Sequence, residues 1–272
     1  MKVLFSFNQK GDGVVNEDVC GFTKDAAWVI DGATDVFNTN ALGKKHEVHW
    51  YVNELNKLLF HNFSCEETDG ISDNLQKSVR ELYQQLILIP KLSEVPVYKL
   101  PTFTIALIRI GANNIMHYYI LGDSSIVYTH GEQFHLLADT RVSVFSRINR
   151  QKLKKHQNNS ANVTPPLSLF QETRMKANAI DGYPIGTIDG EGLNFGISGT
   201  ICLSQGDRII LYSDGFKDYL SENKGAIQNF FTEDAINNEI TKMYEYLRNT
   251  EEFRKKPRPK LIDDATLLLI EI

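Results

Sequence analysis

The sequence predicts an α+β fold in which helices and antiparallel strands form a single domain, residues 1–272. Apolar residues recur at every third or fourth position in residues 44–63, 71–89 and 235–247, which is the period of an amphipathic helix. Elsewhere the apolar runs are short and β-rich, and tight turns separate them, as in antiparallel pairs. Neither an internal repeat nor a domain linker interrupts this pattern.

The expected strands surround the first two helices. Three strands precede the helices at 44–63 and 71–89, and Pro90 ends the second helix because proline cannot continue the backbone ladder. The third helix, at 235–247, comes before the last strand. The predicted strands are residues 3–7, 19–23, 26–30, 102–110, 114–121, 125–129, 208–213 and 265–272.

Composition excludes several classes of protein. The 272 residues carry 29 Lys+Arg against 34 Asp+Glu, a net charge of −5, so a strongly basic nucleic-acid-binding face is not expected. No apolar run approaches the roughly 20 residues that span a bilayer, and the first residues do not resemble a secretory signal. The three cysteines are an odd number at wide spacings, which indicates neither a disulfide framework nor a thiolate zinc site. We expect a cytoplasmic protein without nucleic-acid or membrane partners.

Acidic residues gather where the predicted strands begin or end. If those strands lie side by side, their ends meet at one edge of the sheets and bring the carboxylates within a few ångströms of one another. The acids concerned are Glu17, Asp18, Asp31, Asp123, Asp214, Asp263 and Asp264.

Such a cluster requires cations, because neighbouring carboxylates raise each other's pKa or push each other apart. All-oxygen ligand sets suit Mg²⁺ or Mn²⁺. Two ions about 3.5–4 Å apart could share a carboxylate and a water, supply hydroxide near neutral pH and bind the oxygens of a phosphoryl group. The acids therefore favour metal-assisted phosphoryl chemistry.

A simpler role stays open for each acid. Asp-Gly is a common turn dipeptide, and acids at strand ends are often turn residues. Asp35 has the same ambiguity, since it could join the metal edge or act in a loop or as a helix cap.

Six short motifs occur in a familiar order. They are Asn16-Glu17-Asp18, Val29-Ile30-Asp31-Gly32, the run from Pro101 to Leu107, Gly122-Asp123-Ser124-Ser125, the run from Gln205 to Asp218 that contains Asp214-Gly215, and Asp263-Asp264-Ala265-Thr266. Each motif is weak alone. Together, and over essentially the whole chain, they resemble the metal-dependent type-2C serine/threonine protein phosphatases, with features closer to divergent bacterial members.

The resemblance implies a four-layer α/β/β/α sandwich, with two central antiparallel sheets flanked by helix pairs. It also implies hydrolysis of phosphoserine and phosphothreonine on proteins by a metal-bridging hydroxide, with two Mg²⁺ or Mn²⁺ ions and a third, weaker one. The implied catalytic residues are Asp31, which bridges the two ions, Asp214 and Asp263. The implied metal ligands are Glu17, Asp18, Asp31, Gly32, Asp123, Asp214, Asp218 and Asp263.

Three positions depart from the family pattern. Gly13 stands where the family commonly has an arginine that holds the substrate phosphate, and Lys10 of the same loop is the candidate substitute. A lysine would replace a bidentate fork by a point charge. Ala33 stands where some members have a histidine, and Ser125 where the third motif has an arginine.

Two basic segments have open roles. Residues 140–171 contain no Asp or Glu, and we expect a solvated face or a flap-like segment at about 140–180 beside the site. The basic run 254–260 is either a solvated loop or, because it leads directly to Asp263, an element that attracts phosphate.

The leading functional hypothesis is therefore a Mg²⁺/Mn²⁺-dependent phosphoprotein phosphatase that acts as a monomer and opposes a cognate Ser/Thr kinase. Two alternatives stay open. Because Gly13, Ala33 and Ser125 depart from the family pattern, the chain could be a catalytically weak or inactive sensor or adaptor with the same fold. It could also act on a small phosphate ester.

Overall fold

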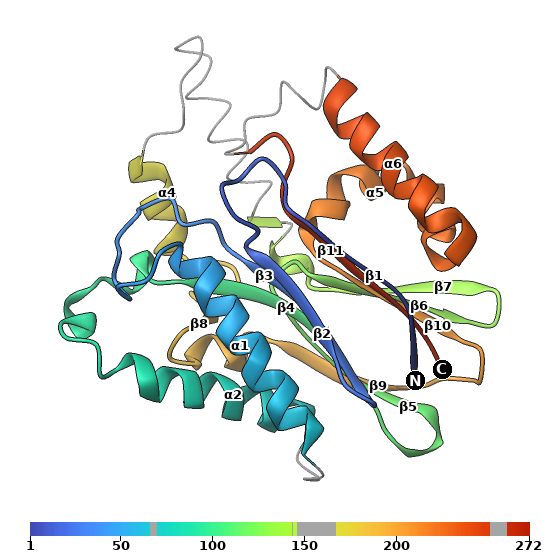
Figure 1. Ribbon diagram of the computed structural model, residues 1–272, viewed down its shortest axis with the longest axis horizontal. Helices are drawn as coiled ribbons and strands as arrows, with labels where there is room; N and C mark the ends of the chain where they lie inside the picture. The colour runs from blue at the N-terminus through green and yellow to red at the C-terminus, as the bar shows by residue number, and fades with distance from the viewer. Residues whose placement is uncertain (66–69, 143, 146–166, 251–259) are drawn as a thin grey trace.

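Two antiparallel sheets lie face to face at the centre of the molecule, and helices cover the outer face of each (Figure 1). The computed structural model describes residues 1–65, 70–142, 144–145, 167–250 and 260–272. The four-layer sandwich that the resemblance implied is therefore confirmed. Among the described residues no helix is long and apolar enough to cross a membrane.

Both sheets join strands that are distant in the chain. The first sheet has the order β1-β11-β10-β6-β7, and the second has the order β2-β3-β4-β5-β9 with β8 beside the start of β4. The first sheet consists of β1 (Lys2–Gln9), β11 (Ala265–Glu271), β10 (Arg208–Tyr212), β6 (Ser125–His130) and β7 (Gln133–Ala138). The second consists of β2 (Asp18–Phe22), β3 (Ala26–Gly32), β4 (Thr102–Ile110), β5 (Ile115–Leu121), β9 (Ile197–Cys202) and β8 (Gly186–Thr187).

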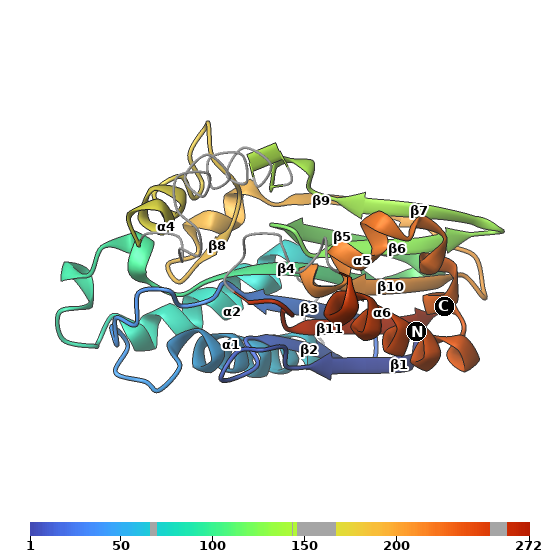
Figure 2. The same ribbon diagram turned by 90° about the horizontal axis from the view of Figure 1, so that it is seen from above.

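Helices α1 and α2 cover the second sheet, whereas α5 and α6 cover the first. Figure 2 shows α4 and β8 at one end of the sandwich and the chain termini toward the other. The α-helices are α1 (Glu47–Ser64), α2 (Ile71–Leu86), α4 (Leu167–Arg174), α5 (Lys217–Glu222) and α6 (Glu233–Asn249). Short 3₁₀ helices are η1 (Leu92–Glu94), η2 (Val97–Lys99), η3 (Ala112–Asn114), η4 (Glu191–Phe195), η5 (Asp214–Phe216) and η6 (Lys224–Phe231).

The unbroken apolar run of β3 follows from its position between two layers. Successive side chains of a strand point to opposite faces. Trp28 and Ile30 pack against α1 and α2, whereas Ala27 and Val29 pack between the two sheets. Because both faces are buried, the strand has no polar alternation, and the acid that follows it emerges at the edge of the core.

Several boundaries differ from the sequence prediction. The first helix begins at Glu47 rather than 44, since His46 has a left-handed backbone (φ 52°) that does not continue a helix. The second ends at Leu86 rather than 89, and the next two residues, Ile87 and Leu88, are exposed. Strands β7, β8 and β9 and helices α4 and α5 were not predicted.

Candidate metal centre

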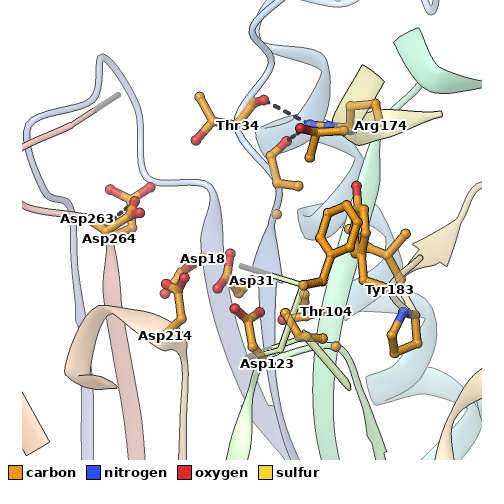
Figure 3. A pocket seen from close by; sticks show the side chains of 18 residues that line it. Asp18, Asp31, Thr34, Thr104, Asp123, Arg174, Tyr183, Asp214, Asp263 and Asp264 are labelled. Atoms are coloured by element: carbon orange, nitrogen blue, oxygen red, sulfur yellow. Dashed lines mark hydrogen bonds between the residues drawn. The ribbon is translucent and has the colours of Figure 1, made fainter. Parts of the chain in front are cut away.

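Three strand ends from both sheets bring aspartates together at one edge of the sandwich. Asp31 is near the end of β3, Asp123 lies in the turn between β5 and β6, and Asp214 follows β10. One carboxylate oxygen of each lies within 4.8 Å of the others. Figure 3 shows these side chains and Asp18 pointing toward one another. The convergence expected from the sequence therefore occurs for these acids.

The register of the second sheet positions two of the acids. Asp18 on β2 is paired directly with Asp31 on β3. Ser213, from the other sheet, donates a hydrogen bond from its hydroxyl to Asp18 Oδ2 at 2.6 Å. The N–H of Gly32 donates to the Glu17 carbonyl at 3.0 Å. These bonds fix the acids across the boundary between the sheets.

At this edge Gly32 and Gly122 lie so close to neighbouring atoms that a larger residue would not fit. A Cβ atom on Gly32 would lie 2.4 Å from a methyl carbon of Val48 on α1. Gly122 has a φ of +85°, and a Cβ there would lie 2.5 Å from Thr104 Cγ2. The tight turn at Gly122 directs Asp123 toward the other carboxylates, so the Asp-Gly and Gly-Asp pairs serve both the turn and the cluster.

Asp264 has a structural role that the neighbouring acids lack. Its Oδ1 accepts the Gly11 N–H and its Oδ2 accepts the Glu17 N–H, each at 2.8 Å. An asparagine has only one acceptor oxygen for these two donors. Asp264 is 2% exposed, whereas the side chain of Asp263 is 50% exposed. Asp264 therefore anchors the loop that precedes β2.

Burial and mutual repulsion raise the pKa of three acids well above the ordinary value. Burial is the main cause for Asp18, Asp31 and Asp214. Neighbouring aspartates add to the effect, with Asp18 the strongest for Asp31, and Asp31 the strongest for Asp214. The ionised cluster therefore destabilises the fold by itself. Carboxylate oxygens that repel one another in this way suit a hard divalent cation as ligands.

A pocket of about 260 Å³ opens over the acids. Most of the predicted ligands line it, but Glu17, Asp218 and Lys10 are not among the lining residues. Glu17 is buried beside the pocket, and Asp218 lies on α5. The lining includes Asp18, Asp31, Gly32, Thr34, Thr104, Asp123, Phe145, Arg174, Tyr183, Asp214, Asp263 and Asp264.

Lys10 does not reach the pocket. Its ammonium group donates to the Gly13 carbonyl at 2.6 Å, and the side chain is exposed. Asp35 has the loop role, because its carboxylate accepts the N–H groups of Phe37 and Asn38 at 3.0 and 2.9 Å. The sequence analysis had left both possibilities open for Asp35.

Arg174 is a pocket residue that the sequence analysis missed. It ends α4, inside the segment expected to be flap-like, and much of that segment lies outside the described residues. Its guanidinium donates to Thr102 Oγ1 at 2.7 Å. It also donates to the carbonyls of Ala33 and Thr34 at 3.1 and 3.0 Å (Figure 3). Burial lowers its pKa. Nothing in the local sequence distinguishes this arginine from the other basic residues nearby.

No family model matches the chain, and no curated protein matches its sequence. Solved structures match over nearly the whole length. The serine/threonine phosphatase PstP/Ppp of Mycobacterium tuberculosis gives a TM-score of 0.61 at 14% identity, covering 98% of this chain and 97% of that one. Stp1 from Staphylococcus aureus gives 0.61 at 15% identity, covering 100% and 96%. A PstP catalytic domain in complex with two manganese ions gives 0.58 at 15% identity, covering 98% and 96%. The chain therefore has the fold of the bacterial PPM-type phosphatases.

We expect Asp31→Asn to stabilise the metal-free protein at pH 7. A carboxyl with a raised pKa contributes stability at low pH that is lost as the pH rises through the folded-state pKa, so the ionised group opposes folding at pH 7. The variant should raise the metal-free Tm by roughly 2–4 °C, equivalent to about 1 kcal/mol, with a smaller gain at pH 4. Mn²⁺ should raise the Tm of the wild type but not of the variant. Asp35→Asn is the matched control and should keep the Mn²⁺ shift.

Asp264→Asn should destabilise the metal-free protein, because one of two backbone donors loses its acceptor. The expected loss is about 1–3 kcal/mol in the free energy of unfolding, measured by urea denaturation. Asp263→Asn should change it by less than about 0.5 kcal/mol, since the exposed side chain keeps its one backbone bond. Equal losses in the two variants would contradict the anchoring role of Asp264.

Proposed function

We propose that this protein is a divalent-metal-dependent phosphatase that hydrolyses phosphoserine and phosphothreonine on proteins. The observation that carries the proposal is the convergence of Asp31, Asp123 and Asp214 from both sheets onto one pocket, in the fold of the PPM-type phosphatases. Mg²⁺ or Mn²⁺ bound there would activate water and neutralise charge on a phosphoryl group. Two ions, with a third weaker one, are the proposed complement.

The role proposed for each metal ligand follows from its position in the site. Asp31 lies at the centre of the cluster and is the proposed bridging ligand, with the Gly32 carbonyl beside it. Asp214 and Asp263 complete the catalytic set, while Asp18 and Glu17 support it from the buried side. Asp123 and Asp218, together with Asp214, are the proposed ligands of the third ion. In this arrangement the protein's task is to hold charged oxygens at fixed positions without reorganisation.

The wall opposite the acids combines one cation with aromatic surface. Arg174 lines the pocket beside Ala33 and Thr34. The rings of Phe145 and Tyr183 pack with centroids 4.8 Å apart. A charged edge facing an apolar wall suits a phosphate carried on a polypeptide side chain. The proposed partners are therefore a phosphorylated protein and the Ser/Thr kinase that modifies it.

The function is tested by hydrolysis of phosphoserine and phosphothreonine peptides in the presence of Mn²⁺. We expect turnover that a chelator abolishes and that Asp31→Asn lowers by at least about 100-fold, the scale of a lost electrostatic element in an active site. Asp35→Asn, an acid beside the cluster that caps a loop, should retain most activity. A folded, metal-loaded protein without turnover would instead support the adaptor role, and turnover confined to small phosphate esters would favour the metabolite alternative.

Arg174→Ala should raise KM for a phosphopeptide by about tenfold, with a smaller effect on kcat, because the cation and the anchor of the pocket wall are both lost. The variant should also lose about 1–3 kcal/mol of stability, since three backbone or hydroxyl acceptors lose their donor. Arg174→Lys should rescue little, because an ammonium cannot reproduce the planar fork.

Arg141→Ala is the matched control for Arg174. Arg141 belongs to the same basic segment but bonds Asp139 and the Phe195 carbonyl, and it does not line the pocket. Its removal should leave KM within about twofold, because Arg141 does not line the pocket. An equal rise of KM in both variants would contradict a specific role for Arg174.

A further inference from the structure

Lys260 places an ammonium group among the acids at one side of the metal centre. Its Nζ lies 3.0 Å from Glu17 Oε2, 3.4 Å from Asp263 Oδ1 and 3.5 Å from Asp264 Oδ2. The side chain is only 12% exposed. The three donors of the ammonium thus face three carboxylates.

The charge of this ammonium is stabilised where it lies. A lysine amine is protonated at physiological pH, and three carboxylate oxygens lie within 3.5 Å of this one. It acts as a permanent monovalent cation within the acidic edge.

The backbone around Lys260 is held in register with the loop before β2. The Asp12 N–H donates to the Ile262 carbonyl and the Ile262 N–H donates to Asp12 Oδ2, both at 3.0 Å. A Cβ atom on Gly13 would lie 3.2 Å from Lys260 Cε and 3.3 Å from its Nζ. The absence of a side chain at Gly13 leaves the room that the lysine occupies.

The acidic edge therefore has two parts, and lysine side chains neutralise the carboxylates of these two parts to different extents. On one side Asp31, Asp123 and Asp214 have carboxylate oxygens within 4.8 Å of one another. The ammonium of Lys217 approaches that side only at 3.8 Å from Asp123, on a side chain that is 41% exposed. On the other side, Lys260 already contacts Glu17 and Asp263.

We propose that Lys260 is a built-in competitor for the divalent cation on the Glu17–Asp263 side. This inference rests on the metal centre of the proposed function. One ion binds on the side of Asp31 and Asp214, whereas an ion that uses Glu17 and Asp263 binds only when the ammonium leaves those oxygens. The two ions therefore bind in unequal steps, and Lys260 sets the metal concentration at which the site is filled.

The first test counts bound Mn²⁺ by electron paramagnetic resonance of the free ion. The wild type should show one tighter and one weaker class of sites. Lys260→Gln should tighten the weaker class by about tenfold or more, because a charge in contact with its ligands is removed. Lys10→Gln removes the same charge from an exposed side chain that contacts only a backbone carbonyl, and it should change neither class.

The second test uses the wild-type chain, so it does not depend on how well a variant folds. An amine-acetylating reagent, followed by mass spectrometry, should label Lys260 slowly in the metal-free protein. Saturating Mn²⁺ should raise the rate at Lys260 at least severalfold, because displacement exposes an amine that is only 12% exposed in its ion pairs, while Lys10 stays unchanged.

Neither measurement uses turnover, so failure of the competition and failure of the phosphatase proposal are distinguishable. Unchanged labelling of Lys260 on Mn²⁺ saturation would overturn the inference. The inference would also be overturned if folded Lys260→Gln bound Mn²⁺ at the weaker class of sites with the same or lower affinity than the wild type. Lys260 would then assist binding of the ion or have no effect on it.

Discussion

Repulsion among crowded carboxylates is the constraint on which the rest of this structure depends. Asp18, Asp31 and Asp214 are held close together at the edge of the core, and desolvation together with like charge raises the pKa of each. Without the rest of the fold this arrangement would be unfavourable, because the ionised groups repel one another. It persists because the free energy of two packed sheets exceeds the electrostatic penalty. The stored penalty is also the driving force with which the site attracts cations.

The fold imposes this crowding through backbone geometry. Asp18 and Asp31 are direct partners across two strands, so neither can move away without breaking the register of the second sheet. Asp214 arrives from the first sheet, and Ser213 beside it bonds Asp18 across the junction. The apolar layers on both sides of β3 leave no alternative register, because a slip by one residue would turn Trp28 and Ile30 toward the wrong layer. The free energy gained by packing the hydrophobic core thus offsets the electrostatic cost of bringing the acids together.

The sequence was sufficient for features that are local or periodic. The strand β4 has the predicted bounds, and the amphipathic period located α1, α2 and α6 to within a few residues. Asp31 and Asp214 could be assigned because each follows an apolar strand directly. By contrast β7 and β9 are edge strands with no fully buried residue, and their sequences lack a long apolar run. The positions of Arg174 and Lys260 depend on long-range contacts, which no local pattern of charge encodes. The same limitation applies to Lys10, which does not line the pocket.

Asp263 and Asp264, the two adjacent acids just before β11, have different roles. Asp264 is buried and satisfied by two backbone N–H groups, so its charge is committed to holding the loop before β2. Asp263 is half exposed and lines the pocket, and its Oδ1 accepts the Asp264 N–H and lies 3.4 Å from Lys260 Nζ. Lys260 contacts both, and it therefore joins the anchoring of the loop to the occupancy of the site. In the proposed competition, an ion that displaces this lysine would also release one contact of the anchor. The proposed metal binding would for that reason be coupled to the anchoring of the loop before β2.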